Sequence, residues 1–85
     1  MPPVVIYTKS SCPYCRAAKD LLRRKGAPFE EIVVDGDRAG RAAMAQKAGG
    51  RSSVPQIFIG AAHVGGCDEL YALEGAGRLD VLLAG

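Results

Sequence analysis

The feature that most constrains the fold is the change of hydrophobic period at residue 12. Before it, Val4-Val5-Ile6-Tyr7 is a short apolar run rich in β-branched residues, which predicts a buried strand. After it, apolar residues recur at steps of three and four and mark one face of a helix: Tyr14, Ala17, Ala18, Leu21 and Leu22. Pro13 suits the first helical turn, where its missing N–H removes no bond, and Gly26 suits the helix end. We therefore expect a strand that passes through a short polar loop into a helix.

The rest of the chain continues this alternation of strands and helices. We expect a strand over residues 29–34, an alanine-rich helix over 38–48 after the turn Asp35-Gly36-Asp37, and a hairpin from strands 56–59 and 63–64. A last helical region starts at Cys67 and contains Leu70, Leu73, Leu79, Leu82 and Leu83. This order predicts an α/β fold whose first three elements form a right-handed parallel crossover. With 85 residues and no linker or repeat, the chain is expected to be a single domain, residues 1–85.

Charge and hydropathy argue against two classes of partner. The net charge of +2, from 11 basic and 9 acidic side chains, is too close to neutral to predict nucleic-acid binding. The one basic run, Arg23-Arg24-Lys25, falls at the end of a predicted helix, where solvated cations complement the helix dipole. We expect no leader, because no basic and apolar stretch with small residues opens the sequence, and no apolar run approaches the ~20 residues of a membrane span. We expect a cytoplasmic protein whose three cysteines stay reduced unless chemistry oxidises them.

Cys12 and Cys15 form a Cys-x-x-Cys motif where the first strand hands over to the first helix, a setting that indicates redox chemistry. Cys12 comes just before the helix, so free N–H groups and the positive end of the helix dipole favour its thiolate, as do Lys9 and Arg16. Cys15 lies one turn further on, where burial keeps it protonated. We predict that Cys12 attacks and that Cys15 resolves.

Two other interpretations of the cysteine pair are available. His63 and Cys67 could complete a zinc site with it, although no second closely spaced pair exists and Pro13 favours a redox turn. The pair could also be purely structural, although its position in a loop implies exposure. Outside a zinc site, His63 is expected to be a surface residue of the hairpin.

Three blocks of the sequence together resemble the glutaredoxins of the dithiol class. The blocks are Thr8-Lys9-x-x-Cys12-Pro13-Tyr14-Cys15, Ser53-Val54-Pro55-Gln56-Ile57-Phe58-Ile59 and Gly65-Gly66-Cys67-Asp68, in the order and spacing of the family. Thioredoxins are the nearest alternative, but they carry Trp-Cys-Gly-Pro-Cys, and this chain has no tryptophan. The resemblance implies a thioredoxin-like α/β fold, with a four-stranded mixed sheet flanked by three or four helices. It also implies a cis peptide before Pro55.

The resemblance further implies a glutathione-dependent thiol-disulfide oxidoreductase, with glutathione as co-substrate and no metal. Its partners would be glutathionylated or disulfide-containing proteins, with ribonucleotide reductase as one candidate. The sequence says little about oligomeric state, and a monomer is the default expectation. Some glutaredoxins instead hold an iron–sulfur cluster between two subunits. Pro13 is expected to disfavour that role by stiffening the turn.

A glutathione site around the cysteines follows from the same resemblance. Val54 would hold the cysteinyl unit through two main-chain bonds, as an added strand does. The start of the last helical region would receive the γ-glutamyl carboxylate on its N–H groups and the ammonium group on Asp68. The residues implied are Lys9, Tyr14, Arg51, Ser53, Val54, Pro55, Gly66, Cys67 and Asp68.

Several of these residues have a second interpretation. Asp68 could merely cap its helix, and Arg51 could be solvated surface. Lys9, expected near the glycine carboxylate, could act mainly on Cys12. Cys67 is expected to be a small packed residue beside the ligand, with a third redox-active thiol as the alternative.

Overall fold

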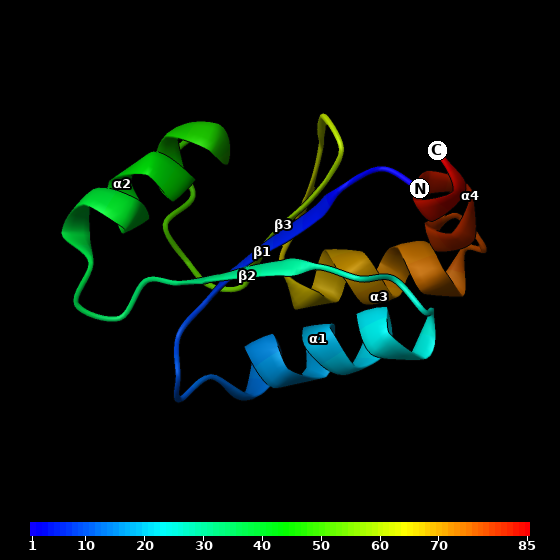
Figure 1. The fold of residues 1–85 in the computed structure, drawn as a ribbon, viewed down its shortest axis with the longest axis horizontal. Coiled ribbons are helices and arrows are strands. Elements are labelled where there is room, and N and C mark those ends of the chain that lie inside the picture. The colour runs from blue at the N-terminus through cyan, green and yellow to red at the C-terminus, as the bar shows by residue number, and fades with distance from the viewer.

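A computed structural model describes all of residues 1–85 and contains one four-stranded sheet with helices on both faces (Figure 1). The elements are β1 (Val4–Thr8), α1 (Pro13–Arg24), β2 (Glu30–Val33), α2 (Arg38–Lys47), β3 (Gln56–Ile59), β4 (Ala62–Gly65), α3 (Cys67–Gly75) and α4 (Leu79–Ala84). The strand order is β2-β1-β3-β4, with β1 parallel to β2 and the other two pairs antiparallel. The predicted mixed sheet is therefore confirmed.

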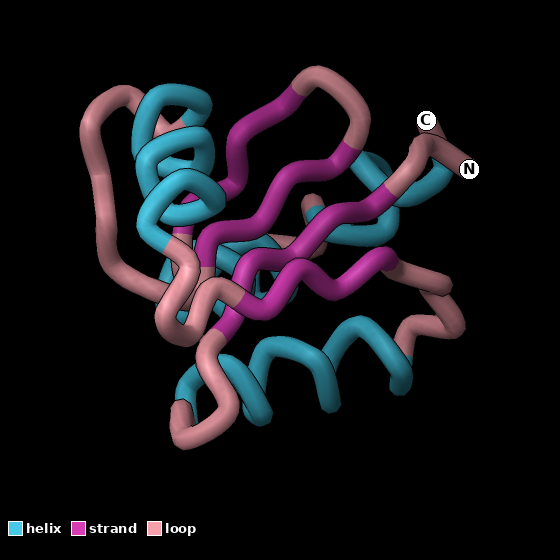
Figure 2. The backbone as a smooth tube through the Cα atoms, turned by 60° about the vertical axis from the view of Figure 1, so that its left-hand side comes forward, coloured by secondary structure: helices cyan, strands magenta, loops and turns pink.

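The helices cover the two faces of the sheet unequally (Figure 2). α1 and α3 lie on one face, where they enclose the main core: Val4, Ile6, Ala18, Leu21, Leu22, Ala27, Ile57, Ile59, Cys67, Leu70, Leu79 and Leu83. α2 lies on the opposite face above a smaller cluster of Tyr7, Val34 and Met44. Every buried side-chain nitrogen and oxygen has a hydrogen-bond partner. None of the helices combines the length and apolar character needed to cross a membrane.

The ends of α1 follow the signals in its sequence. Cys12 has extended backbone angles and is the N-cap, with Pro13 as the first helical residue. At the other end Gly26 has φ +65°, a value that glycine adopts without a Cβ clash. The N–H of Gly26 donates to the carbonyl of Arg23 at 3.0 Å, and the N–H of Ala27 donates to the carbonyl of Leu22 at 3.0 Å. This pair of bonds is the Schellman arrangement that ends many helices.

The last helical region is two helices rather than one. Gly77 has φ +71°, and the N–H of Arg78 donates back to the carbonyl of Leu73 at 2.9 Å, which closes α3 before α4 begins. The break lets α4 turn back, so that Leu79 and Leu83 reach the main core and the two chain termini lie side by side. The run of leucines alone did not reveal this break.

Lys25 is not the solvated side chain that its position in a basic run predicted. Its ammonium group lies 2.8 Å from a carboxylate oxygen of Glu74 in α3 and 2.9 Å from one of Asp80 in α4. Its side chain is only 18% exposed, whereas Arg23 and Arg24 are exposed as expected. Because α3 ends and α4 begins beside the end of α1, these two helices bring two carboxylates to one cation.

Candidate active site

Cys12 lies where the loop after β1 meets the first turn of α1. The loop is fixed by Asp35, which accepts the Ser10 N–H at 2.9 Å and the Ser10 hydroxyl on its other oxygen. The Cys12 sulfur is half-buried, accepts the N–H of Cys15 at 3.1 Å and lies 4.0 Å from the carbonyl oxygen of Val54. An N–H directed at sulfur stabilises negative charge there, as the helix-start position predicted.

Cys15 has the opposite environment to Cys12, although only two residues separate them. It is 1% exposed on the inner face of α1. Burial, followed by a hydrogen bond with Cys12, raises the pKa of Cys15 to about 12, against smaller opposing effects from the backbone of Lys9 and the charge of Lys19. The predicted burial of Cys15 is confirmed, and its thiol stays protonated at neutral pH. Both cysteines are free thiols in this structure.

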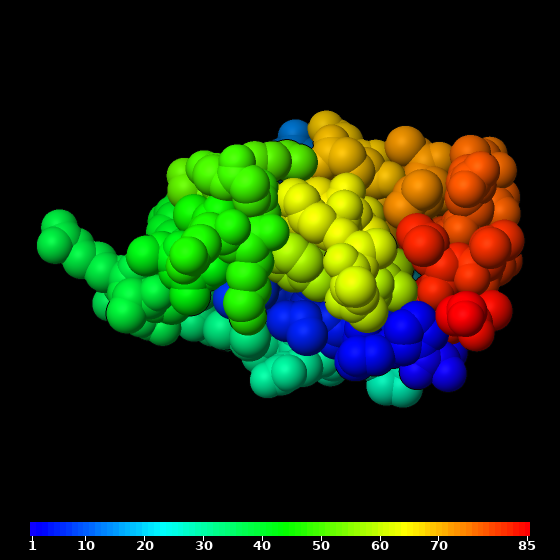
Figure 3. Space-filling model, turned by 90° about the horizontal axis from the view of Figure 1, so that it is seen from above, coloured from blue at the N-terminus to red at the C-terminus, as the bar shows by residue number.

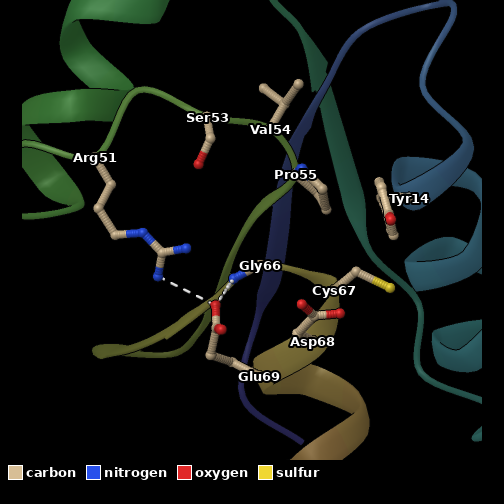
Figure 4. A pocket seen from close by; sticks show the side chains of 9 residues that line it. All are labelled: Tyr14, Arg51, Ser53, Val54, Pro55, Gly66, Cys67, Asp68 and Glu69. Atoms are coloured by element: carbon tan, nitrogen blue, oxygen red, sulfur yellow. Dashed lines mark hydrogen bonds and ion pairs between the residues drawn. The ribbon is translucent and has the colours of Figure 1, made fainter.

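A groove beside Cys12 gathers all the residues implied as glutathione ligands except Lys9 (Figure 4). One wall is the loop that leads into β3, and the other is the first turn of α3. The lining residues are Tyr14, Arg51, Ser53, Val54, Pro55, Gly66, Cys67, Asp68 and Glu69. Lys9 lies on the loop before α1, outside this lining.

The wall before β3 leaves the main-chain groups of Val54 without a backbone partner. The peptide between Val54 and Pro55 is cis, as the resemblance implied. Neither the N–H nor the carbonyl of Val54 bonds to another backbone group. The carbonyl has one hydrogen-bond contact, with the Cys12 sulfur at 4.0 Å. One donor and one acceptor beside the reactive sulfur are what an extended peptide needs in order to pair as an added strand.

The opposite wall begins at Gly66, the N-cap of α3. Glu69 reaches back to accept the Gly66 N–H at 2.6 Å and pairs with Arg51 at 3.1 Å. The Gly66 N–H, and then Arg51, hold the pKa of Glu69 below its ordinary value. Asp68 is exposed, and its carboxylate has no hydrogen-bond or ion-pair partner in the chain, so it is not the capping residue. It is therefore free to meet a cationic group in the groove.

Glycine is required at residue 65, where the strand turns into the helix. Gly65 has φ +110°, and a Cβ there would lie 2.6 Å from Oε1 of Glu69 and 3.0 Å from a guanidinium nitrogen of Arg51. A side chain would therefore displace the ion pair that joins the two walls. Sequence reasoning missed Glu69, although its position three residues after the N-cap is typical of a capping carboxylate.

Comparisons with known proteins agree with this geometry. The sequence profile of the glutaredoxin family matches residues 4–64. The chain belongs to the glutaredoxin family. Among curated relatives it is 62% identical over 84 residues to a glutaredoxin of Pseudomonas aeruginosa, covering 99% of both chains. It is 55% identical over 83 residues to glutaredoxin 3 of Escherichia coli, covering 98% of this chain and 99% of that one.

The fold comparison gives the same result. A crystal structure of a buckwheat glutaredoxin–glutathione complex superposes with a TM-score of 0.87 at 35% identity, covering 98% of this chain and 77% of that one. The thioredoxin-like fold is thus confirmed. The chain is a thiol-disulfide oxidoreductase whose Cys12-Pro13-Tyr14-Cys15 motif is that of the dithiol class.

Two of the alternative interpretations can be compared with this glutaredoxin's structure. The structure gathers no group of three or more His, Cys, Asp and Glu side chains around one point, so it does not bring His63 and Cys67 together with the cysteine pair as zinc ligands. Cys67 is 8% exposed, and its pKa is raised by burial and then by the charge of Asp68. A raised pKa disfavours the thiolate, as expected for a packed residue rather than a third reactive thiol.

Proposed function

We propose that this glutaredoxin uses glutathione to reduce glutathione mixed disulfides and protein disulfides, through Cys12 and Cys15. The observation that carries the proposal is the groove beside the Cys12 sulfur, with the free backbone of Val54 on one wall and the first turn of α3 on the other. A related buckwheat glutaredoxin forms a complex with glutathione. We further propose that residues 1–85 act as one domain, as a monomer in the cytoplasm.

The groove offers a receiver for each charged end of glutathione. The N–H groups at the start of α3 suit the γ-glutamyl carboxylate, and the unpaired Asp68 suits the neighbouring ammonium group. Arg51 is the cation of the opposite wall, although Glu69 neutralises part of its charge at 3.1 Å. Lys9, on the loop before Cys12, would approach the glycine carboxylate from outside the groove.

Reduction of a glutathione mixed disulfide needs Cys12 alone. Its thiolate attacks the glutathione sulfur, a disulfide forms between Cys12 and glutathione, and the substrate leaves as a thiolate that takes up a proton. The thiolate of a second glutathione then attacks the bound glutathione sulfur. Glutathione disulfide leaves, and the Cys12 thiolate is regenerated. The N–H of Cys15, 3.1 Å from the sulfur, stabilises the charge at the beginning and end of this cycle.

Reduction of a protein disulfide needs both cysteines. Cys12 attacks one sulfur of the substrate and forms a mixed disulfide, and the other substrate sulfur leaves. Cys15 then loses its proton and attacks the Cys12 sulfur, which releases the second substrate thiol and closes a disulfide between Cys12 and Cys15. Two glutathione molecules reduce that disulfide. Proteins with exposed disulfides are the proposed substrates, with ribonucleotide reductase as one candidate.

Two variants and two substrates test this proposal. Cys12→Ser is expected to abolish reduction of a glutathionylated peptide and of a protein disulfide. Cys15→Ser is expected to retain the first activity and lose the second, because only the second uses the resolving thiol. Each reaction is followed with glutathione and glutathione reductase, and again with thioredoxin reductase. Activity only with thioredoxin reductase would contradict the use of glutathione, and loss of both activities in Cys15→Ser would contradict the one-cysteine route.

A further inference from the structure

His63 makes a specific hydrogen bond, although it is a surface residue of the hairpin as expected. It lies on the edge strand β4, and the β3–β4 hairpin, yellow in Figure 3, faces solvent between α2 and α3. Its Nε2 lies 2.7 Å from Oε1 of Gln56, a polar side chain that is 0% exposed. The imidazole also stacks on Phe58, with ring centroids 4.9 Å apart and planes 26° apart. The stacking therefore restrains the plane of the imidazole ring, and the hydrogen bond restrains its rotation within that plane.

The other end of the Gln56 amide reaches the active-site groove. Its Nε2 donates to the carbonyl oxygen of Ser53 at 3.0 Å and lies 3.3 Å from the Ser53 hydroxyl. A carbonyl oxygen only accepts, so the amide nitrogen must face Ser53 and the amide oxygen must face His63. His63 Nε2 is consequently the donor. The three residues form a chain from the surface of β4 to the wall of the groove, with every role assigned.

The loop that this chain reaches has few other attachments. None of the N–H or carbonyl groups of residues 52–55 takes part in a backbone–backbone hydrogen bond. Besides the bond from Gln56 to Ser53, the loop is held by Arg41 of α2, which donates twice to the carbonyl of Ser52, at 3.1 and 2.8 Å. Hydrogen bonds from side chains outside the groove therefore help to hold the loop, beside the packing of Val54 against the Tyr7, Val34 and Met44 cluster.

We infer that His63 is a positioning residue for the glutathione groove. It holds the Gln56 amide in the orientation that anchors Ser53, and so sets the direction of the free Val54 N–H and carbonyl. This inference rests on the proposed function, because it assumes that Val54 pairs with the glutathionyl unit. A peptide whose cysteine carries mercaptoethanol has no glutathionyl unit to pair with Val54, so the effect of His63 is specific to glutathionylated substrates.

The test compares His63→Phe with the unmodified protein. Phenylalanine keeps an aromatic ring to stack on Phe58 but cannot donate to Gln56. The substrates are one peptide whose cysteine carries either glutathione or mercaptoethanol as a mixed disulfide. We expect His63→Phe to lower kcat/KM for the glutathionylated peptide by roughly three- to tenfold, the size of one hydrogen bond. The mercaptoethanol derivative should react at an unchanged rate.

A double-mutant cycle shows whether His63 acts through Gln56. Gln56→Met removes both bonds of the amide with little change in side-chain length. Because His63 works only through that amide, His63→Phe should have no further effect on kcat/KM in the Gln56→Met background. The amide resonance of Ser53 in the glutathione-free protein should shift in both single variants, whether or not catalysis is measured.

Three results would overturn the inference. The first is an unchanged kcat/KM for the glutathionylated peptide in His63→Phe, and the second is an equal loss on both substrates. The third is an additive effect of the two substitutions. If instead the unmodified protein showed no preference for the glutathionylated peptide, the proposed function itself would fail. An unchanged Ser53 resonance in His63→Phe would then also reject the positioning role, since that measurement needs no glutathione.

Discussion

The rate at which Cys15 resolves a mixed disulfide should rise about tenfold for each unit of pH between about pH 6 and pH 9. Only the thiolate attacks a disulfide, and burial is the largest cause of a Cys15 pKa of about 12. At pH 7 only a very small fraction of Cys15 is then thiolate in the reduced protein. In the mixed disulfide, Cys12 no longer carries charge or accepts the thiol proton, but burial still keeps the pKa above its ordinary value of 9.0.

So small a thiolate fraction is compatible with turnover because the two sulfurs are held together. Cys12 caps α1, and Cys15 lies in the first turn of the same helix, with its N–H 3.1 Å from the Cys12 sulfur. Well-aligned intramolecular reactions reach effective concentrations of ~10⁵ M or more. Proximity can therefore offset the scarcity of thiolate. The resolution rate still follows the thiolate fraction, which is why it should depend steeply on pH.

Rapid mixing with an aromatic disulfide that releases a coloured thiol separates the two steps. Attack by Cys12 releases one equivalent, and resolution by Cys15 releases the second. The second phase should accelerate about a hundredfold between about pH 6 and pH 8. Cys15→Ser should show the first phase only, and Cys67→Ser, the control for the third thiol, should keep both. A second phase that levels off below about pH 8 would refute control by burial.

Three further predictions concern stability, measured by chemical denaturation. Glu69→Gln should lower the free energy of unfolding by about 1 kcal/mol, because it weakens the cap on Gly66. Since the pKa of Glu69 is lowered in the fold, this contribution is present above about pH 4.5 and lost as the pH falls through the folded pKa. Thr8→Val should cost about 1–2 kcal/mol, because the buried hydroxyl donates to the Glu31 carboxylate at 2.6 Å. Lys25→Met should lower the free energy of unfolding, because two carboxylates lose their cation. This loss should become smaller as the salt concentration is raised, because salt screens the ion pairs. A loss that does not depend on salt would contradict an electrostatic role.

The parts of the fold that follow from local chemistry were predictable from the sequence. Pro13 at the start of α1, Gly26 after its end and Asp37 as the cap of α2 act on the backbone within four residues of themselves. Their effects do not depend on how the helices pack. The period change at residue 12 likewise placed Cys12 at a helix start before any tertiary contact was known. These local signals are sufficient to place the reactive cysteine, Cys12, at the start of α1.

The side-chain partnerships could not be predicted in this way. Lys25 looked like one of three solvated cations, but the end of α3 and the start of α4 each place a carboxylate beside it. Arg51 was placed in the groove, but not its pairing with Glu69. No acidic or nucleophilic residue lies near His63 in the sequence at a spacing that indicates a catalytic pair. Its actual partner, Gln56, is an amide on the neighbouring strand. Each pairing depends on the relative placement of two elements, which hydrophobic periodicity does not encode.

The groove explains why such distant partners matter in this fold. A loop that offers its own N–H and carbonyl groups to a peptide cannot also use them to hold itself in place. Residues 52–55 accordingly have no backbone–backbone hydrogen bonds, and Arg41 and Gln56 hold them from α2 and β3. The position of Val54 then depends on these side-chain hydrogen bonds and on its packing against Tyr7, Val34 and Met44. Residues such as His63, which hold those side chains in turn, are where substitutions should change substrate preference without touching the cysteines.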